Sequence, residues 1–158
     1  YLGLNTDVQQ LAYVLKPGEK EAPAYLVKAL AVANRLQDVL TESFALDKTG
    51  NAVLKQALAQ AKKENINASI YTHPIGYHGH AAGPAIGMWD MQGGVPGTGD
   101  YTLQYNTAYA IELNAKIILP EWKNKEVRMM LEEQGVFTTK GVRYIDGRQK
   151  TLLLIPRQ

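Results

Sequence analysis

The sequence contains no cysteine among its 158 residues. It therefore forms no disulfide bond and offers no thiolate to a metal ion, so any metal must be held by histidine and carboxylate side chains. Cysteine content alone does not decide the cellular compartment. No apolar run approaches the roughly 20 residues of a membrane-spanning helix, and we expect no membrane contact. The net charge of +2 is not concentrated in a basic stripe, so we expect no nucleic-acid partner.

The spacing of apolar residues predicts the secondary structure. Apolar residues recur every three or four positions over residues 21–43 and 51–64, which predicts two helices, the second capped by Thr49 or Asn51. Alternating or β-branched runs predict the strands of one sheet. The last strand along the chain is expected to complete this sheet. These strands are two segments around Asp7 within residues 1–15, then 68–72, 107–113, 116–119, 126–137, 142–145 and 151–155. This order indicates an α+β fold in a single domain.

Histidine is scarce and clustered. All three histidines lie within residues 71–80, between a predicted strand and a long glycine-rich stretch, residues 81–105. Neutral imidazole is a common metal ligand and a proton shuttle near neutral pH. The cluster therefore marks a candidate site, and acidic partners are needed to specify its chemistry.

Carboxylates in the predicted strands supply such partners. Glu112 shares one strand face with Ala108 and Ala110, which leave open space beside it. A glutamate is almost never buried without a partner, so its place in so apolar a strand indicates a bound cation. Glu132 and Glu133 alternate across the next long strand, where a cation site and a solvated strand edge are equally compatible with the sequence.

Asp7 completes the acidic set. It follows Asn5 and Thr6, and by itself it is also typical of a turn. With one imidazole, the acidic residues form an oxygen-rich set that suits Mn, Co, Fe or Zn and differs from a closed structural zinc site. The candidate ligands are Asp7, His73, Glu112 and Glu132.

Short motifs surround each of these residues. His73 opens His-Pro-Ile-Gly, and His80 follows seven residues later. Glu112 lies in Ala-Ile-Glu-Leu and Glu132 in Leu-Glu-Glu-Gln-Gly-Val-Phe-Thr, while Asp7 ends Gly-Leu-Asn-Thr-Asp. In order and spacing, over nearly the whole chain, these motifs resemble those of the pita-bread metallopeptidases: aminopeptidase P, prolidase, methionine aminopeptidase and the metal-free creatinase.

The resemblance implies a pita-bread fold, with two helices and a curved, mainly antiparallel sheet. It implies two divalent ions in the parent protein, Mn, Co or Zn, bound by the four candidate ligands together with a further aspartate of the hairpin. The implied activity is hydrolysis of the N-terminal bond of short peptides, with Xaa-Pro as the expected substrate class, by a hydroxide that bridges the ions. Glu112 would also relay the proton of that water, and His80 would hydrogen-bond the substrate carbonyl.

Three further residues are expected to line the substrate pocket. They are His78, Trp89 and Asp90. A solvated position at the rim accounts equally well for His78, and packing of the glycine-rich loop accounts equally well for the other two.

The sequence also departs from the family pattern. The first aspartate of the family hairpin would lie upstream of Tyr1, so we expect residues 1–158 to be the C-terminal part of a longer catalytic domain, beginning with a hairpin remnant. This piece is expected to bind one ion or none, with impaired activity, and its unpaired sheet edge predicts a homo-oligomer. Met130 replaces an arginine of aminopeptidase P and prolidase, and Pro74 replaces a glycine.

Two other functions remain compatible with these motifs. One is a non-catalytic binding module that has kept the fold, although such a module has no need of carboxylates that face a cavity. The other is a creatinase-like hydrolase without metal, although the presence of Asp7, Glu112 and Glu132 disfavours it.

Overall fold

The two helices of the computed structural model, which describes residues 5–157, follow from their apolar spacing. α1 spans Ala24–Glu42 and α2 spans Gly50–Lys63, so both predicted helices are confirmed. The Thr49 side chain caps α2 by accepting a hydrogen bond from the N–H of Ala52. Within the described part of the chain, no helix has the length and apolar character needed to cross a membrane.

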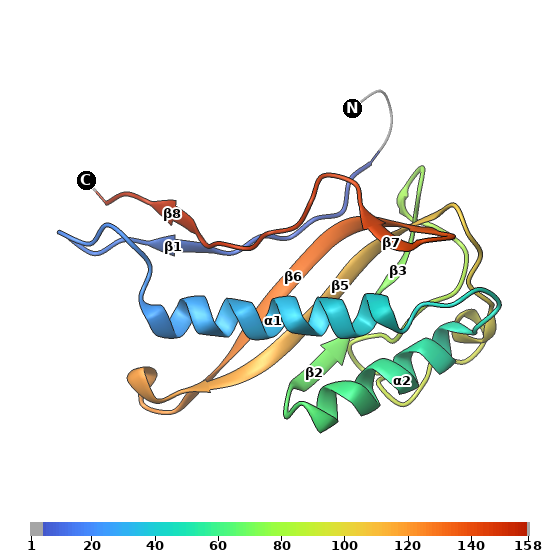
Figure 1. The fold of residues 1–158 in the computed structure, drawn as a ribbon, viewed down its shortest axis with the longest axis horizontal. Coiled ribbons are helices and arrows are strands. Elements are labelled where there is room, and N and C mark those ends of the chain that lie inside the picture. Colours follow the sequence, from blue (N-terminus) through green and yellow to red (C-terminus); the bar gives the residue numbers. More distant parts are fainter. Residues whose placement is uncertain (1–4, 158) are drawn as a thin grey trace.

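The main sheet has six strands, and every strand pair within it is antiparallel. The strands are β2 (Asn67–Ile70), β3 (His73–Gly76), β4 (Gly79–His80), β5 (Thr107–Leu119), β6 (Lys125–Thr138) and β7 (Gly141–Tyr144). The long strands β5 and β6 pair along their whole length and form the curved centre of the sheet (Figure 1). β2 and β3 both pair with the other edge of β5, β4 forms a hairpin with β3, and β7 pairs with the end of β6. The α+β fold class is confirmed.

β5 is one strand where the sequence predicts two. The break expected between residues 113 and 116 is absent, because β6 continues the ladder there. Asn114 lies opposite Met130, and Ala115 lies opposite Met129. Asn114 and Ala115 are both buried. A polar residue therefore interrupts the apolar pattern of the sequence without interrupting the pairing.

β1 (Ala12–Val14) and β8 (Leu153–Ile155) form a separate parallel pair beside the main sheet (Figure 1). The expectation that the last strand completes the main sheet is therefore wrong. Just after β7, the backbone N–H of Ile145 still donates to the carbonyl oxygen of Gln134 in β6. Beyond Ile145 the chain leaves the main sheet. The first strand segment expected before Asp7 falls partly on residues 1–4, which lie outside the described residues, and residues 5–8 form no strand.

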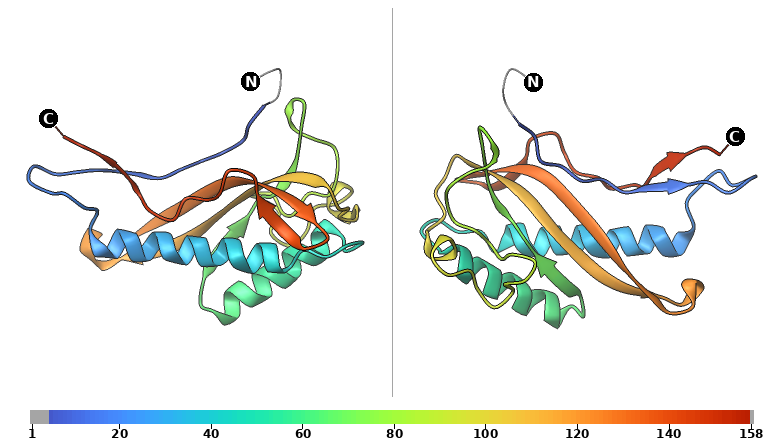
Figure 2. Two further views of the ribbon diagram at one scale, coloured as in Figure 1. Left: turned by 45° about the horizontal axis from the view of Figure 1, so that its top comes forward. Right: turned by 180° about the vertical axis from the view of Figure 1, so that it is seen from behind.

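The hydrophobic core lies between the two helices and one face of β5 and β6, and Figure 2 shows both helices on the same side of this strand pair. On β5 this face carries Tyr109, Ile111 and Leu113, which are fully buried. Because side chains alternate across a strand, Glu112 lies on the opposite face. The packing of the helices thus determines which face of the sheet is left for the candidate site.

Gly87, in the loop after the histidine-bearing strands, gives a test of the packing behind the site. Its φ is +77°, and a Cβ at this position would overlap the backbone oxygen of Ile70 in β2. Gly147 has nearly the same φ, +76°, with nothing within 4 Å of its Cβ position. We expect Gly147→Ala to lower the free energy of unfolding by about 1 kcal/mol because of its backbone conformation. Gly87→Ala should lower it by about 3 kcal/mol or more, because the backbone of β2 must also move.

Urea denaturation of the two variants measures this difference. Equal losses would show that the close approach to Ile70 contributes nothing beyond the left-handed backbone.

Candidate metal centre

Two glutamates face each other across the central strand pair. Glu112 in β5 lies directly opposite Glu132 in β6. Glu132 is 7% exposed and the Glu112 side chain 14%, so both carboxyl groups are largely withdrawn from water. Like charges in such a pair repel each other, and a buried carboxylate is stable only when it is protonated or paired with a cation. The burial of Glu132 excludes the alternative of a solvated strand edge.

Glu133 lies on the other face of β6 and has a structural environment. Its carboxylate accepts a hydrogen bond of 2.7 Å from the backbone N–H of Gln149, and both residues are buried. The alternation of β6 therefore separates the two adjacent glutamates, and Glu132 alone of this pair faces the histidines.

β3 brings His73 to the two opposed glutamates. It pairs His73 with Ala110 of β5, two residues before Glu112 and on the same face. The Nδ1 atom of His73 lies 3.1 Å from the Pro74 carbonyl oxygen, which accepts a hydrogen from it and leaves a lone pair on Nε2. That Nε2 atom is buried, lies 3.8 Å from Oε2 of Glu112, and has no hydrogen-bond partner among the described residues. A buried imidazole lone pair directed at carboxylates is the usual setting of a metal ligand.

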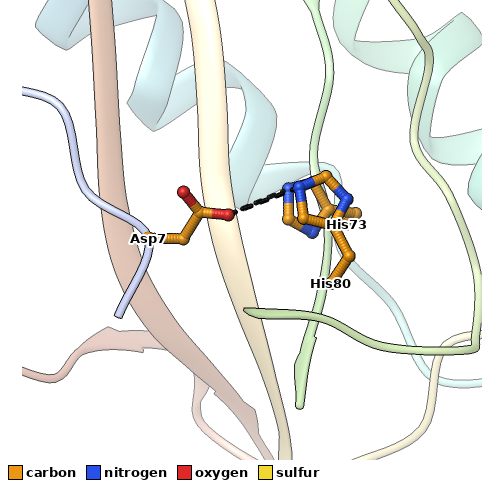
Figure 3. A group of neighbouring side chains, drawn as sticks. All are labelled: Asp7, His73 and His80. Carbon is orange, nitrogen blue, oxygen red and sulfur yellow. Dashed lines mark ion pairs between the residues drawn. The ribbon is translucent and has the colours of Figure 1, made fainter. Parts of the chain in front are cut away.

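Asp7 reaches the same place from the N-terminal segment. Two backbone hydrogen bonds join Gln9 and Glu132, from the N–H of each to the carbonyl oxygen of the other, at 2.9 and 3.2 Å. This bridge holds the segment along β6, so that Oδ2 of Asp7 lies 3.7 Å from Nε2 of His73 (Figure 3). Asp7 thus has the position expected of a ligand, although the segment around it is not a strand.

His80 joins the site from the other side of the β3–β4 hairpin, where it pairs with Ile75. Its ring stacks on His73, with centroids 3.8 Å apart and planes at 18°. Its Nε2 atom lies 3.5 Å from Oδ2 of Asp7, and Figure 3 shows both imidazoles directed at that oxygen. The His80 side chain is 60% exposed, so it marks the open side of the site.

Donor atoms converge in two overlapping groups that share His73. One group is Asp7, His73 and His80, and the other is His73, Glu112 and Glu132; within each, one ligand atom of every residue lies within 4.8 Å of the others. The buried lone pair of His73 and the two opposed carboxylates fit a divalent cation, which would replace a repulsion by an attraction. All four predicted ligands are brought together.

The protein environment shifts the pKa values of Glu112, Glu132 and His73 in the directions that favour their neutral forms. Burial raises the pKa of Glu112 to about 7, and the charge of Asp7 adds to this effect. Burial, followed by the charges of Glu112 and Asp7, raises the pKa of Glu132. Burial lowers the pKa of His73, which favours its neutral, metal-binding form. Shifts of this kind are typical of functional sites. A bound cation would offset them, because it stabilises the charged form of each carboxylate.

Tyr71 also borders the site, and it was not among the residues predicted from the sequence. Its ring centroid lies 5.3 Å from that of His73, 6.0 Å from that of His80 and 5.8 Å from that of Trp89. Burial raises its pKa, and the charge of Glu112 raises it further. Its position two residues before His73 is the feature of the sequence that could have identified it, since alternate residues of an extended chain share a face.

The remaining predicted pocket residues lie further from the ligands. Trp89 is 39% exposed and reaches the site through its edge contact with Tyr71. Asp90 is exposed beside it. His78 is exposed in the β3–β4 turn, where its ring packs against Tyr77. Their roles toward a substrate stay predictions.

Comparisons with known proteins identify the architecture. A scan against models of protein families finds no match, and neither does a search of curated proteins. Among solved structures, the chain is similar to the X-Pro aminopeptidase from Thermotoga maritima MSB8, with a TM-score of 0.69 and 14% identity over 98% of this chain and 39% of that one. The chain has the pita-bread fold.

Two further structures show the range of proteins that share this pita-bread architecture. Methionine aminopeptidase from Rickettsia prowazekii gives a TM-score of 0.62 at 17% identity, over 91% of this chain and 59% of that one. The N-terminal domain of the FACT complex subunit SPT16 from Cicer arietinum (chickpea) gives 0.61 at 15% identity, over 83% of this chain and 31% of that one. The pita-bread chain thus spans between 31% and 59% of the length of these three neighbours.

The raised pKa values predict how the stability of the metal-free protein depends on pH. A carboxyl group whose pKa is higher in the folded state contributes stability that is complete below its unfolded value and is lost as the pH rises through the folded value. The free energy of unfolding should therefore fall by about 1–3 kcal/mol between about pH 6.5 and about pH 8. His73 acts in the opposite direction, but mainly below this range.

Denaturation at several pH values, with chelator present, measures this fall. Glu132→Gln should reduce it, whereas Glu126→Gln, at an exposed position of the same strand, should not. Saturation with a divalent ion should also reduce the fall, because the ion stabilises the charged carboxylates. A curve of unchanged slope in Glu132→Gln would contradict the assignment of the loss to this group.

Proposed function

We propose that this protein is a metal-dependent peptidase that hydrolyses the N-terminal bond of short peptides, with Xaa-Pro peptides as its substrates. One observation supports this proposal above the others: Glu112 and Glu132 are opposed and buried beside the unpartnered Nε2 atom of His73. Such an arrangement is unfavourable in a domain that only packs or binds, because it holds like charges together without compensation.

Four residues of the site would hold the ion, and one of them, Glu112, would also move a proton. Asp7, His73, Glu112 and Glu132 would hold the ion, and when bound it supplies a Lewis acid and a water of lowered pKa. The Glu112 carboxylate lies in the same group of ligand atoms, within reach of a water on the ion, so it is suited to accept the proton of the attacking water and to return it to the leaving amine.

The open side of the site is where a peptide would enter. His80 lies there with its side chain 60% exposed, within reach of a substrate carbonyl, to which its protonated nitrogen would donate a hydrogen bond. Tyr71 and Trp89 form an apolar wall next to it that suits a small ring such as proline. His78 and Asp90, further out, would contact only longer peptides.

The names of the structural neighbours agree with a peptidase but do not decide it. Two of them are an X-Pro aminopeptidase and a methionine aminopeptidase, whereas the third is a domain of a FACT complex subunit. The fold by itself is therefore compatible with a binding module. The assignment depends on the ligands and on the proton-carrying carboxyl group.

Peptide hydrolysis tests the proposal directly. We expect the metal-loaded protein to release the N-terminal residue from Xaa-Pro peptides, at a low rate in keeping with the impaired activity expected of residues 1–158, and to lose this activity when a chelator removes the metal. Glu112→Gln should lower kcat by about 100-fold or more, because the amide cannot accept the proton of the water. Glu126→Gln, at an exposed position of β6, should retain full activity and serves as the matched control.

Other outcomes point to the alternatives. Activity that a chelator leaves unchanged would favour a metal-free hydrolase. Stoichiometric metal binding without hydrolysis of Xaa-Pro, Xaa-Ala and methionyl peptides would favour a binding module. Hydrolysis of Xaa-Ala peptides at the same rate would overturn the preference for proline and leave the peptidase assignment intact.

A further inference from the structure

Two cations face each other on the side of the sheet that carries the metal centre. Lys116 in β5 lies directly opposite Arg128 in β6, just as Glu112 lies opposite Glu132. Side chains alternate along a strand, so residues four positions apart share a face, and both pairs lie on the face away from the helices. Like charges directly opposite each other are unfavourable in a sheet. Lys116 and Arg128 thus form a basic pair that needs a compensating anion.

The basic pair has no acidic partner in the part of the chain that the structure describes. The arginine ion pairs found there belong to Arg35 and Arg148, and none joins the basic pair to a carboxylate. Glu126, two residues before Arg128, is exposed and lies diagonally across the strand pair from Lys116, outside ion-pair distance. Lys116 is half-buried and Arg128 is exposed, so the pair is open to a ligand.

The distance between the metal centre and the basic pair matches one acidic side chain. Glu112 and Lys116 are four residues apart on β5, which separates their Cα atoms by about 13 Å. A lysine side chain spans about 6 Å from its Cα and a glutamate side chain about 5 Å. A carboxylate on the first residue of a peptide can therefore reach Lys116 while the first carbonyl of that peptide lies at the metal centre. Asn114 and Met130, opposite each other between the two pairs, form the floor of this space.

We infer that the basic pair selects peptides with an acidic N-terminal residue, glutamate above all, by binding its side-chain carboxylate. This inference rests on the proposed function and names the first residue of its Xaa-Pro substrates. The first side chain lies over Asn114 and Met130, and the rest of the peptide leaves by the open side at His80. Aspartate is one methylene shorter than glutamate and reaches the pair less well.

A substrate carboxylate would replace the repulsion within the basic pair by two attractions. Arginine can bind a carboxylate through two parallel hydrogen bonds, and lysine adds a further charge. Because the pair is partly solvated, the selectivity is modest and falls as salt screens the charges. Glutamine has the size of glutamate without its charge, so a comparison of the two as first residue isolates the electrostatic contribution.

Hydrolysis of Glu-Pro-Ala and freshly dissolved Gln-Pro-Ala by the full metal-loaded chain tests this selectivity. We expect kcat/KM to be about 5-fold or more higher for the glutamyl peptide at low salt. In Lys116→Gln and in Arg128→Gln this ratio should fall to about 2 or less. Lys125→Gln, which removes an exposed cation of β6 opposite Leu119, is the matched control and should keep the ratio of the unmodified protein. Urea denaturation confirms that each variant is folded.

Calorimetric binding of analogues that cannot be hydrolysed separates this inference from the proposed function. In these analogues the carbonyl of the first peptide bond is reduced to a methylene group. Tighter binding of the glutamyl analogue, lost in Lys116→Gln, without hydrolysis of either peptide would support the basic pair and overturn the peptidase. Equal hydrolysis and equal binding of the glutamyl and glutaminyl compounds would overturn this inference and leave the peptidase standing. Absence of both binding and hydrolysis would overturn both.

Discussion

The antiparallel register of β5 and β6 is the constraint on which the site depends, because it places Glu112 opposite Glu132. A slip of one residue would turn one of the two glutamates toward the helices and into the apolar core. Fully buried side chains such as Tyr109 and Leu131 lie on that core face, so the packing that stabilises the fold also fixes the register. The energy of the hydrophobic core thus holds together two groups that repel each other.

Segments far apart in the sequence then add the remaining donors to this strand pair. β3 hydrogen-bonds to β5 and directs His73 at Glu112, while the bridge between Gln9 and Glu132 brings Asp7 from the other edge. The β3–β4 hairpin folds His80 over His73. Each donor is held by main-chain hydrogen bonds, so the site is preorganised and does not depend on long flexible side chains.

Much of this arrangement could be predicted from the sequence, because it depends on local periodicity and on short motifs. The two helices and the face of β5 that carries Glu112 were predicted correctly. The four candidate ligands do lie close together, and their role toward a metal stays a prediction. The single strand through Asn114 was missed because its continuity depends on the partner strand. The pairing of β8 with β1 was missed for the same reason, since a strand of three residues carries no information about its neighbour.

The sequence by itself determined the inventory of the site: three clustered histidines, the alternation that separates Glu132 from Glu133, and no cysteine to compete for a metal. Only the tertiary structure decided which of these atoms converge. It brought Tyr71 and His80 up to His73 and left His78 exposed in the turn, although His78 lies closer to His73 along the chain than His80 does. The physical reason is that a hairpin turn reverses the chain, so distance along the sequence no longer measures distance in space.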